Sequence, residues 1–381
     1  APIFAQQSVR ENARTRRSPQ QVLDDAMWGV FQAGWRDPWG ADADHLKETG
    51  VMAAFVEAGY TFFTVDPGDH VDGDADTDTK ATLEDKLQAV PWDVLDSSPE
   101  DLMGHFLGLE VPLDGMTLVF DEIKLMRAAV KYGPALAHVA RLYRHLCELM
   151  GDRPFDFEVS VDETETPTSV HEHYYIATEL QRLGVTWVSL APRFVGRFEK
   201  GVDFIGDLDE LEQDIARHVA VMQCVGGYKL SVHSGSDKFS LYPAIAESLA
   251  RHRAGVHIKT AGTTWLEELT GLAKSGGEGL AIAKEIYRLA LPRFDELCAP
   301  YAAVIDVQRS RLPRLDEVEG WNAGRFAATL KHAPADTQFN SDFRQFMHVS
   351  FKIAAELGPR YLDALRACQP VVAKHVTENL Y

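Results

Sequence analysis

Short runs of strand-forming residues alternate with longer amphipathic stretches along most of the chain, and this alternation limits the folds available to it. The strand-like runs lie at 27–34, 60–67, 116–123, 155–163, 186–192, 228–235, 255–262 and 302–308. Repeating strand–helix units form parallel sheets. Eight units within 381 residues predict an α/β fold, a (β/α)8 barrel of the TIM type. A doubly wound open sheet is the alternative, which the lack of a glycine-rich phosphate loop after the first strand disfavours.

Two regions interrupt the alternation. Residues 67–115 form a long connection after the second predicted strand, beginning with an acidic run, and its length indicates an inserted segment or a lid. From residue 309 the pattern is mostly helical. We therefore expect a single barrel domain over residues 1–381, with an insertion at 67–115 and a helical C-terminal part at 309–381 that packs on the barrel.

Charge and cysteine content narrow the class of partner. The net charge of −19 and the pI near 5.1 disfavour nucleic acids and anionic membrane surfaces as partners. The four cysteines show no metal-knuckle spacing, so we expect no disulfide framework and a reducing, cytoplasmic setting. No apolar run is long enough to span a membrane, and no signal peptide is visible. A small molecule is the expected substrate, and a homo-oligomer is compatible with the sequence.

Several predicted strands carry polar side chains on one face when they are followed with a period of two. In the run from Tyr228, the apolar face opposes a face with Lys229, Ser231 and His233. The corresponding polar residues of the other runs are Glu158, Ser160, Asp162, Ser189, His257 and Lys259. Because charges are not buried unpaired in a core, this shared face predicts an active site at the C-terminal mouth of the barrel.

The residue types at the strand ends suit a divalent metal. The candidates are Asp121, Glu122, Asp162, Glu163, His233 and His257. Two histidines with one or two carboxylates bind Zn, Mn, Fe, Co or Ni. Asp121 and Glu122 are adjacent and point to opposite faces of a strand, so one of them can be a ligand, and Glu122 is the better choice. Asp121 is then a neighbouring base or a helix N-cap. Asp162 could instead pair with a lysine.

Several charged residues, among them cationic ones, follow the run at 186–192. Arg193, Lys200 and Asp203 lie in APRFVGRFEKGVDFIGD, and Arg193 can hold a carboxylate in a bidentate fork. The amides of HSGSDK can form a small anion-binding nest. Lys229 and Lys259 could form a Schiff base with a carbonyl substrate, or they could neutralise the carboxylates of the mouth.

The segments VFDEIK, VSVDETETPTSVHEHYYIATEL, SLAPRFVGRFEKGVDFIGDL, GYKLSVHSGSDKFSLYP and VHIKTAGTTWLEEL resemble the tagaturonate epimerase family. The resemblance is dense between about residues 116 and 310. It implies a metal-dependent isomerase of hexuronate catabolism that interconverts D-tagaturonate and D-fructuronate, with one divalent cation as cofactor and a sugar acid as substrate. Some members of the family act on the neutral ketoses tagatose and fructose, which is the alternative activity; a sugar-acid aldolase on the same barrel is another.

Carried over position by position, the resemblance implies a role for each matching residue. Asp121 is similar to the family's base and Asp203 to its proton donor. Glu122, His233 and His257 are the implied metal ligands. The implied substrate contacts are Arg193, Lys200, Ser234, Ser236, Asp237 and Lys238, to which the shared polar face adds Asp162, Lys229 and Lys259.

The implied reaction inverts C3 of a 5-keto acid, a carbon β to the ketone. Enolisation acidifies only the α-carbon, so it cannot invert C3. A retro-aldol route can: a base takes the proton of the C3 hydroxyl, the C3–C4 bond breaks, the aldehyde turns, and the bond forms again. A lysine-dependent aldolase and a non-catalytic sugar-acid sensor are the other hypotheses.

Overall fold

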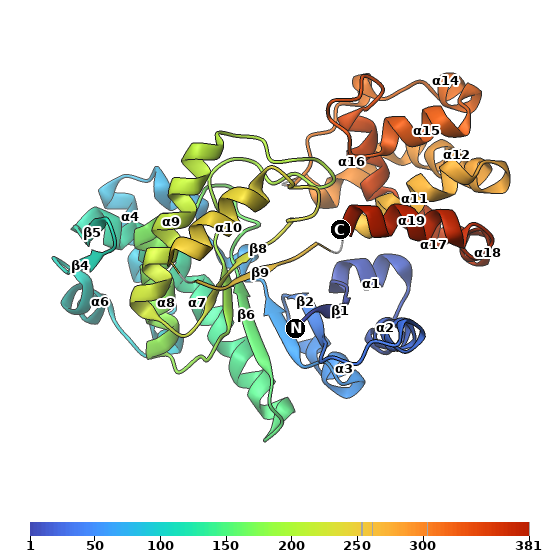
Figure 1. Cartoon of the computed structure of the whole chain (residues 1–381). Helices are drawn as coiled ribbons and strands as arrows, with labels where there is room; N and C mark the ends of the chain where they lie inside the picture. Colours follow the sequence, from blue (N-terminus) through green and yellow to red (C-terminus); the bar gives the residue numbers. More distant parts are fainter. Residues whose placement is uncertain (253, 261, 303, 381) are drawn as a thin grey trace.

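The computed structural model describes residues 1–252, 254–260, 262–302 and 304–380. Its centre is a seven-stranded parallel sheet with the order β1-β2-β3-β6-β7-β8-β9 (Figure 1). These strands are β1 Ile3–Gln6, β2 Gly40–Leu46, β3 Phe62–Val65, β6 Asp156–Ser160, β7 Ser189–Ala191, β8 Lys229–Val232 and β9 Val256–Ile258. A second, antiparallel sheet pairs β4 Glu110–Leu113 with β5 Met116–Val119.

Helices cover the outer side of the sheet. The first part of the chain contains α1 Val9–Thr15, α2 Pro19–Ala33, α3 Met52–Ala58, α4 Lys80–Gln88, α5 Trp92–Leu95, α6 Pro99–Phe106, α7 Glu122–Met150, α8 Val170–Arg182, α9 Leu208–Val225 and α10 Leu241–His252. The 3-10 turns η1 Thr49–Val51, η2 Gly68–His70 and η3 Gly73–Asp76 connect them. Neighbouring pairs from α7 to α10 pack side by side (Figure 1).

A helical region follows β9 and lies beside the sheet unit (Figure 1). Its helices are α11 Gly262–Ser275, α12 Gly277–Ala290, α13 Phe294–Cys298, α14 Leu315–Gly320, α15 Ala323–Leu330, α16 Ser341–Val349, α17 Phe351–Leu357, α18 Pro359–Ala367 and α19 Gln369–Leu380, with η4 Leu291–Arg293, η5 Ala299–Tyr301 and η6 Arg309–Arg311. It buries its own hydrophobic cluster, from Leu266 to Val372, separate from the sheet's cluster, which runs from Ala5 to Ile245.

The sheet curls until strands far apart in its order face each other. β9 forms one edge and β2 is next to the other edge, yet Lys259, just after β9, lies 2.9 Å from a carboxylate oxygen of Asp42 on β2. Within the part of the chain that the structure describes, β1 and β9 are each paired on one side only. The fold is therefore α/β with a curled seven-stranded sheet, and the closed eight-stranded barrel is not confirmed.

Three of the predicted barrel strands are corrected by the structure. Residues 27–34 lie mostly in α2, whose N-terminus carries a capping box of Ser18 and Gln21 and whose outer face exposes Trp28 and Phe31 (68% and 78%). Residues 116–119 form β5 of the small hairpin sheet. The described residues of 302–308 form turns and irregular backbone. β1 and β2 take up sheet positions that the sequence reading did not assign.

The expectations about disulfide bonds and about membrane-spanning segments can be compared directly with the structure. The four cysteines are free thiols, as expected. Among the described helices, none combines the length and the apolar character needed to cross a membrane.

Gly271 shows how closely α11 and α19 pack. A Cβ on Gly271 would lie 2.6 Å from Cα of Val372, which is backbone and cannot rotate away. We predict that Gly271→Ala lowers the free energy of unfolding by about 1–3 kcal/mol through overpacking, measured by denaturant unfolding. Gly320→Ala is the matched control. No described atom lies within 4 Å of its added methyl, so it should be neutral or stabilise by about 0.5 kcal/mol. Equal effects from both would contradict the close packing.

Candidate active site

Glu158 on β6 is the centre of a buried polar cluster on the inner face of the sheet. Its Oε1 accepts a hydrogen bond from Nε2 of His233 at 2.8 Å and lies 3.0 Å from Nζ of Lys259. Its Oε2 accepts from Nδ1 of His257 at 2.8 Å and from the hydroxyl of Ser189. Four side chains from β7, β8 and β9 or their ends therefore converge on one carboxylate, and the shared polar face expected from the sequence is confirmed for these residues.

Lys259 joins this carboxylate to β2 and β3. Its Nζ donates to Asp44 at 2.6 Å and to the hydroxyl of Thr64 at 2.7 Å, and it also contacts Asp42 and Glu158. Burial lowers the pKa of Lys259, but Asp42, Asp44 and Glu158 outweigh it and hold that pKa well above its usual value. Burial raises the pKa of Glu158, but Lys259 and neighbouring histidines bring it well below normal. Both groups are therefore charged at neutral pH.

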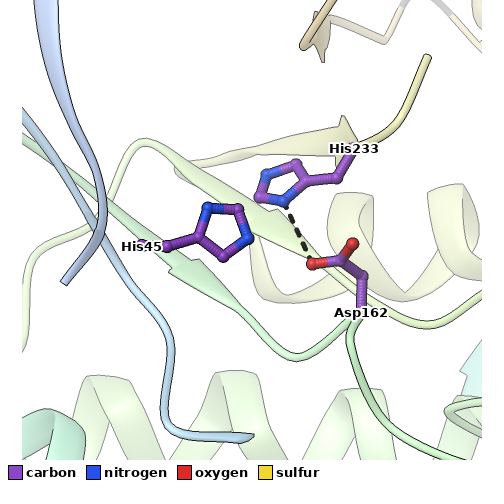
Figure 2. A group of neighbouring side chains, drawn as sticks. All are labelled: His45, Asp162 and His233. Carbon is purple, nitrogen blue, oxygen red and sulfur yellow. Dashed lines mark ion pairs between the residues drawn. The ribbon is translucent and has the colours of Figure 1, made fainter. Parts of the chain in front are cut away.

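Above this cluster, His45, Asp162 and His233 face one another at the mouth (Figure 2). Nδ1 of His233 lies 3.0 Å from a carboxylate oxygen of Asp162, and the rings of His45 and His233 are 5.4 Å apart. One ligand atom from each of the three residues lies within 4.8 Å of the others. His45 also belongs to a second such group, with Asp66 and Glu163.

The donor set at this mouth fits a divalent cation. Nε2 of the partly buried His45 is a buried atom without a hydrogen-bond partner among the described residues, whereas Nδ1 is paired with an oxygen of Asp44 at 2.9 Å. Oδ2 of Asp66 is also buried without a hydrogen-bond partner in the same described set. Buried polar atoms without partners are uncommon in folded proteins. Imidazole and carboxylate are the ligands that Zn and related metals take.

The electrostatics of the mouth favour positive charge. Burial lowers the pKa of His45, but Asp44 and other nearby carboxylates outweigh it and raise that pKa to about 10. Burial likewise lowers the pKa of His233, and Asp162 together with Glu158 raises it to about 9. Burial raises the pKa of Asp162, but His233 and His45 hold it below its usual range. A metal that binds here displaces imidazole protons in a field that already favours a cation.

The structure does not bring Asp121 and Glu122 to this mouth. The carboxylate of Asp121 caps α7 by accepting the backbone amide of Lys124 at 2.9 Å, and Glu122 is exposed and pairs with Lys80. The N-cap alternative considered for Asp121 is what the structure has. The strand before the pair belongs to the hairpin sheet, and for this reason the strand-end argument does not carry these two residues to the curled sheet.

The other candidates divide by position. Asp162, His233, His257 and Lys259 meet in the cluster, as described above. Lys229 begins β8, at the opposite end from His233, and is exposed. Nη1 of Arg193 lies 3.5 Å from the carbonyl of Asp162, and its Nε is buried without a partner among the described residues.

The loop and turn candidates lie beside the mouth. Lys200 lies close enough to Glu163 to help lower the pKa of that carboxyl, against the effect of burial. Asp203 accepts the hydroxyl of Ser240 at 2.7 Å. The turn that follows His233 contains Ser234, Ser236, Asp237 and Lys238; Asp237 and Lys238 are buried and bound to protein atoms.

Sequence reasoning missed the contribution of β2 and β3. Asp42, Asp44 and His45 lie in ADADHL, which alternates alanine with aspartate at a period of two. That alternation was the available signal. It was weak because aspartate and alanine are depleted in strands and no branched residue supports them.

The charge balance around Lys259 leads to a stability prediction. Lys259→Met leaves three buried carboxylates without their cation, so we predict a loss of about 3–5 kcal/mol in the free energy of unfolding. Because the pKa of Lys259 is raised, its contribution is complete below the unfolded pKa of about 10.4 and is lost only as the pH rises further. The deficit should therefore be constant from about pH 6 to 9.

Lys229→Met is the control for this change. Lys229 lies at the start of the neighbouring strand β8 and is exposed. The substitution should alter stability by about 0.5 kcal/mol or less. Equal losses from the two variants, measured by urea unfolding, would contradict the assignment of Lys259 as the central cation.

The family model described as tagaturonate epimerase matches residues 1–356. The tagaturonate/fructuronate epimerase of Thermotoga maritima is 42% identical over 318 residues, which are 84% of this chain and 63% of that relative. The chain thus spans less than two thirds of that relative's length.

Solved structures of the fructuronate-tagaturonate epimerase of Cohnella laeviribosi share the fold. A form complexed with one glycerol has a TM-score of 0.86 at 29% identity, over 100% of this chain and 75% of that one. The native form has a TM-score of 0.79 at 30% identity, over 99% and 76%. With the family model covering most of its length, the chain belongs to the tagaturonate epimerase family.

Proposed function

We propose that this chain carries the site of a metal-dependent epimerase that interconverts D-tagaturonate and D-fructuronate. The relative from Thermotoga maritima bears this activity in its name and shares 42% of its residues over the matched region. The observation that carries the proposal is Nε2 of the partly buried His45, a buried atom without a hydrogen-bond partner among the described residues, beside Asp162 and His233. We assign the cation to these three side chains, in place of Glu122.

His257 takes a different role in this proposal. Its Nδ1 donates to Glu158, whose other oxygen accepts from Nε2 of His233. A carboxylate that accepts from the far nitrogen of a metal-binding histidine fixes its ring orientation and raises its basicity. Glu158 therefore orients His233, and His257 helps to hold Glu158 in place.

The reaction we propose is retro-aldol cleavage followed by re-addition. When bound, the cation supplies Lewis acidity toward the ketone oxygen. Glu163 takes the proton of the C3 hydroxyl; its carboxylate receives no hydrogen bond from the described residues, and its nearest cations are Arg10 at 3.6 Å and His45 at 3.8 Å. The C3–C4 bond then breaks to give an aldehyde acid and an enediolate. The aldehyde turns, C3–C4 forms again from the other face, and a proton returns to the C3 oxygen.

Arg193 and Lys200 complete the proposed substrate site. The unpartnered Nε of Arg193, next to the backbone of Asp162, is a donor that a substrate carboxylate can accept from. A partly buried guanidinium group at the mouth favours a uronate over the neutral ketoses tagatose and fructose, which offer no carboxylate. Asp203, on the loop that carries Lys200, stays our prediction for the proton donor on the second face.

The charge state of Lys259 argues against a lysine-dependent aldolase. A Schiff base requires a neutral amine, whereas three carboxylates hold Lys259 as an ammonium. Lys229 is exposed at the far end of its strand. Borohydride in the presence of substrate should therefore trap no adduct on either lysine, and a trapped adduct would support the aldolase.

The ligand assignment predicts which substitutions abolish metal binding. His45→Ala and Asp162→Asn should each lower the affinity for Zn or Mn by at least about tenfold, because each removes one of three ligands. Glu122→Gln, at the exposed start of α7, should leave the affinity unchanged. Calorimetric titration of the purified apoproteins measures all three. Loss of metal from Glu122→Gln with retention in the other two would restore the assignment made from the sequence.

The activity and its route can be tested together. Metal-loaded protein should convert tagaturonate into fructuronate, followed by NMR in D2O, with the C3 hydrogen retained because the retro-aldol route breaks no C–H bond at C3. Deuterium at C3 would instead show direct deprotonation there. Turnover of tagatose alone would favour the neutral ketose. Stabilisation by the sugar acid without turnover of either substrate, with any divalent metal, would favour a sensor.

A further inference from the structure

Helix α16 of the helical region places a charged side chain in the interior of the protein. Arg344 is fully buried (0% exposed), and an ionised group removed from water requires close partners. Its Nε donates to the carbonyl of Gly201 at 2.7 Å, and Nη1 donates to the carbonyl of Leu330 at 2.7 Å. Its Nη2 donates to Asp237 at 2.9 Å and to Glu267 at 3.2 Å. One guanidinium group thus joins four separate segments.

One of these segments is the turn that directly follows His233. Ser234 and Asp237 both have positive φ, of +51° and +63°, in the left-handed region that costs a non-glycine residue roughly 1 kcal/mol or more. A strained turn of this kind persists only when its surroundings hold it. The buried ion pair between Asp237 and Arg344 is such a contact, four residues from His233.

A second segment is the loop that carries Lys200. Besides the bond from Arg344 to Gly201, the buried Lys238 donates to the carbonyl of Glu199 at 2.6 Å and to that of Val202. Gln345, the neighbour of Arg344 on α16, donates to the side chain of Glu199 at 3.0 Å. The loop is therefore fastened both to the turn after His233 and to the helical region.

The contacts around Arg344 are polar, although apolar packing could also hold these segments together. Oδ2 of Asp237 and both ring nitrogens of His332 are buried without hydrogen-bond partners among the described residues. Apolar side chains of similar volume often stabilise a fold as well as a buried ion pair or better. The ion pair differs from apolar packing in fixing direction, because a guanidinium fork donates to its partners in one geometry.

We propose that Arg344 is a positioning residue of the epimerase. Through Asp237 and Gly201 it sets the turn that continues from His233 and the loop that carries Lys200, so the helical region takes part in shaping the mouth. The kinetic consequence rests on the proposed function; the structural consequence does not.

The test uses Arg344→Lys, which keeps the charge and loses the fork, and Asp237→Asn, which keeps the size and loses the charge. Each should lower kcat by about tenfold to a hundredfold, the scale expected for misplaced reacting groups, and change KM less. The double variant should be no worse than the more affected single variant, because both break one contact. Arg293→Met is the control: Arg293 pairs with Glu296 and Glu356 in the same helical region and should leave kcat unchanged.

Amide hydrogen exchange is the second readout. The amides of Gly235, Lys238 and Leu241 are hydrogen-bonded within or next to the turn, and they should exchange faster in Arg344→Lys and Asp237→Asn while helices α7 and α12 keep native protection. Native exchange in the turn, or faster exchange throughout the molecule, would overturn the proposal, whatever kcat does. Wild-type protein without turnover would refute the proposed function, and the exchange result would still decide the role of Arg344.

Discussion

The interaction on which the site depends is the contact between Lys259 and three carboxylates from two other strands. Asp42 and Asp44 come from β2, Glu158 comes from β6, and Lys259 follows β9. An exposed surface pair of this kind contributes little, but here all four groups are buried and each carboxylate would be costly without the ammonium. The curl of the sheet and its charge balance are therefore one constraint, since flattening the sheet would separate β2 from β9 and leave the charges unpaired.

This arrangement divides the inner face into two levels. At the lower level the charges are paired within the protein, and Lys259 gives Glu158 the low pKa that lets it accept from both His233 and His257. At the upper level Asp162 faces two imidazoles, and Nε2 of His45 lacks a hydrogen-bond partner among the described residues. The lower level therefore fixes the ring of His233, and the upper level brings one ligand atom each of His45, Asp162 and His233 within 4.8 Å of one another.

The sequence predicted the polar face well because a period of two is a local property. Glu158, Ser189, His233 and His257 were correctly placed on one face, and contacts between them show it. The same test does not say at which end of the sheet a residue lies. Lys229 and Lys259 were therefore given the same candidate roles, although Lys229 begins β8 and Lys259 follows the end of β9. It also could not tell which strands pair, and for this reason Asp121 and Glu122 were assigned to a sheet that their strand does not join.

The helical region adds a constraint that no local pattern contains. The chain leaves the sheet just after Lys259, builds a second hydrophobic cluster, and returns to the mouth through Arg344 on α16. The contact between the two parts at this point is polar and directional, unlike the apolar packing inside each part. A shift of α16 would therefore be transmitted to the backbone of the turn beside His233, because Asp237 and Gly201 bind the same guanidinium group and cannot follow separate movements.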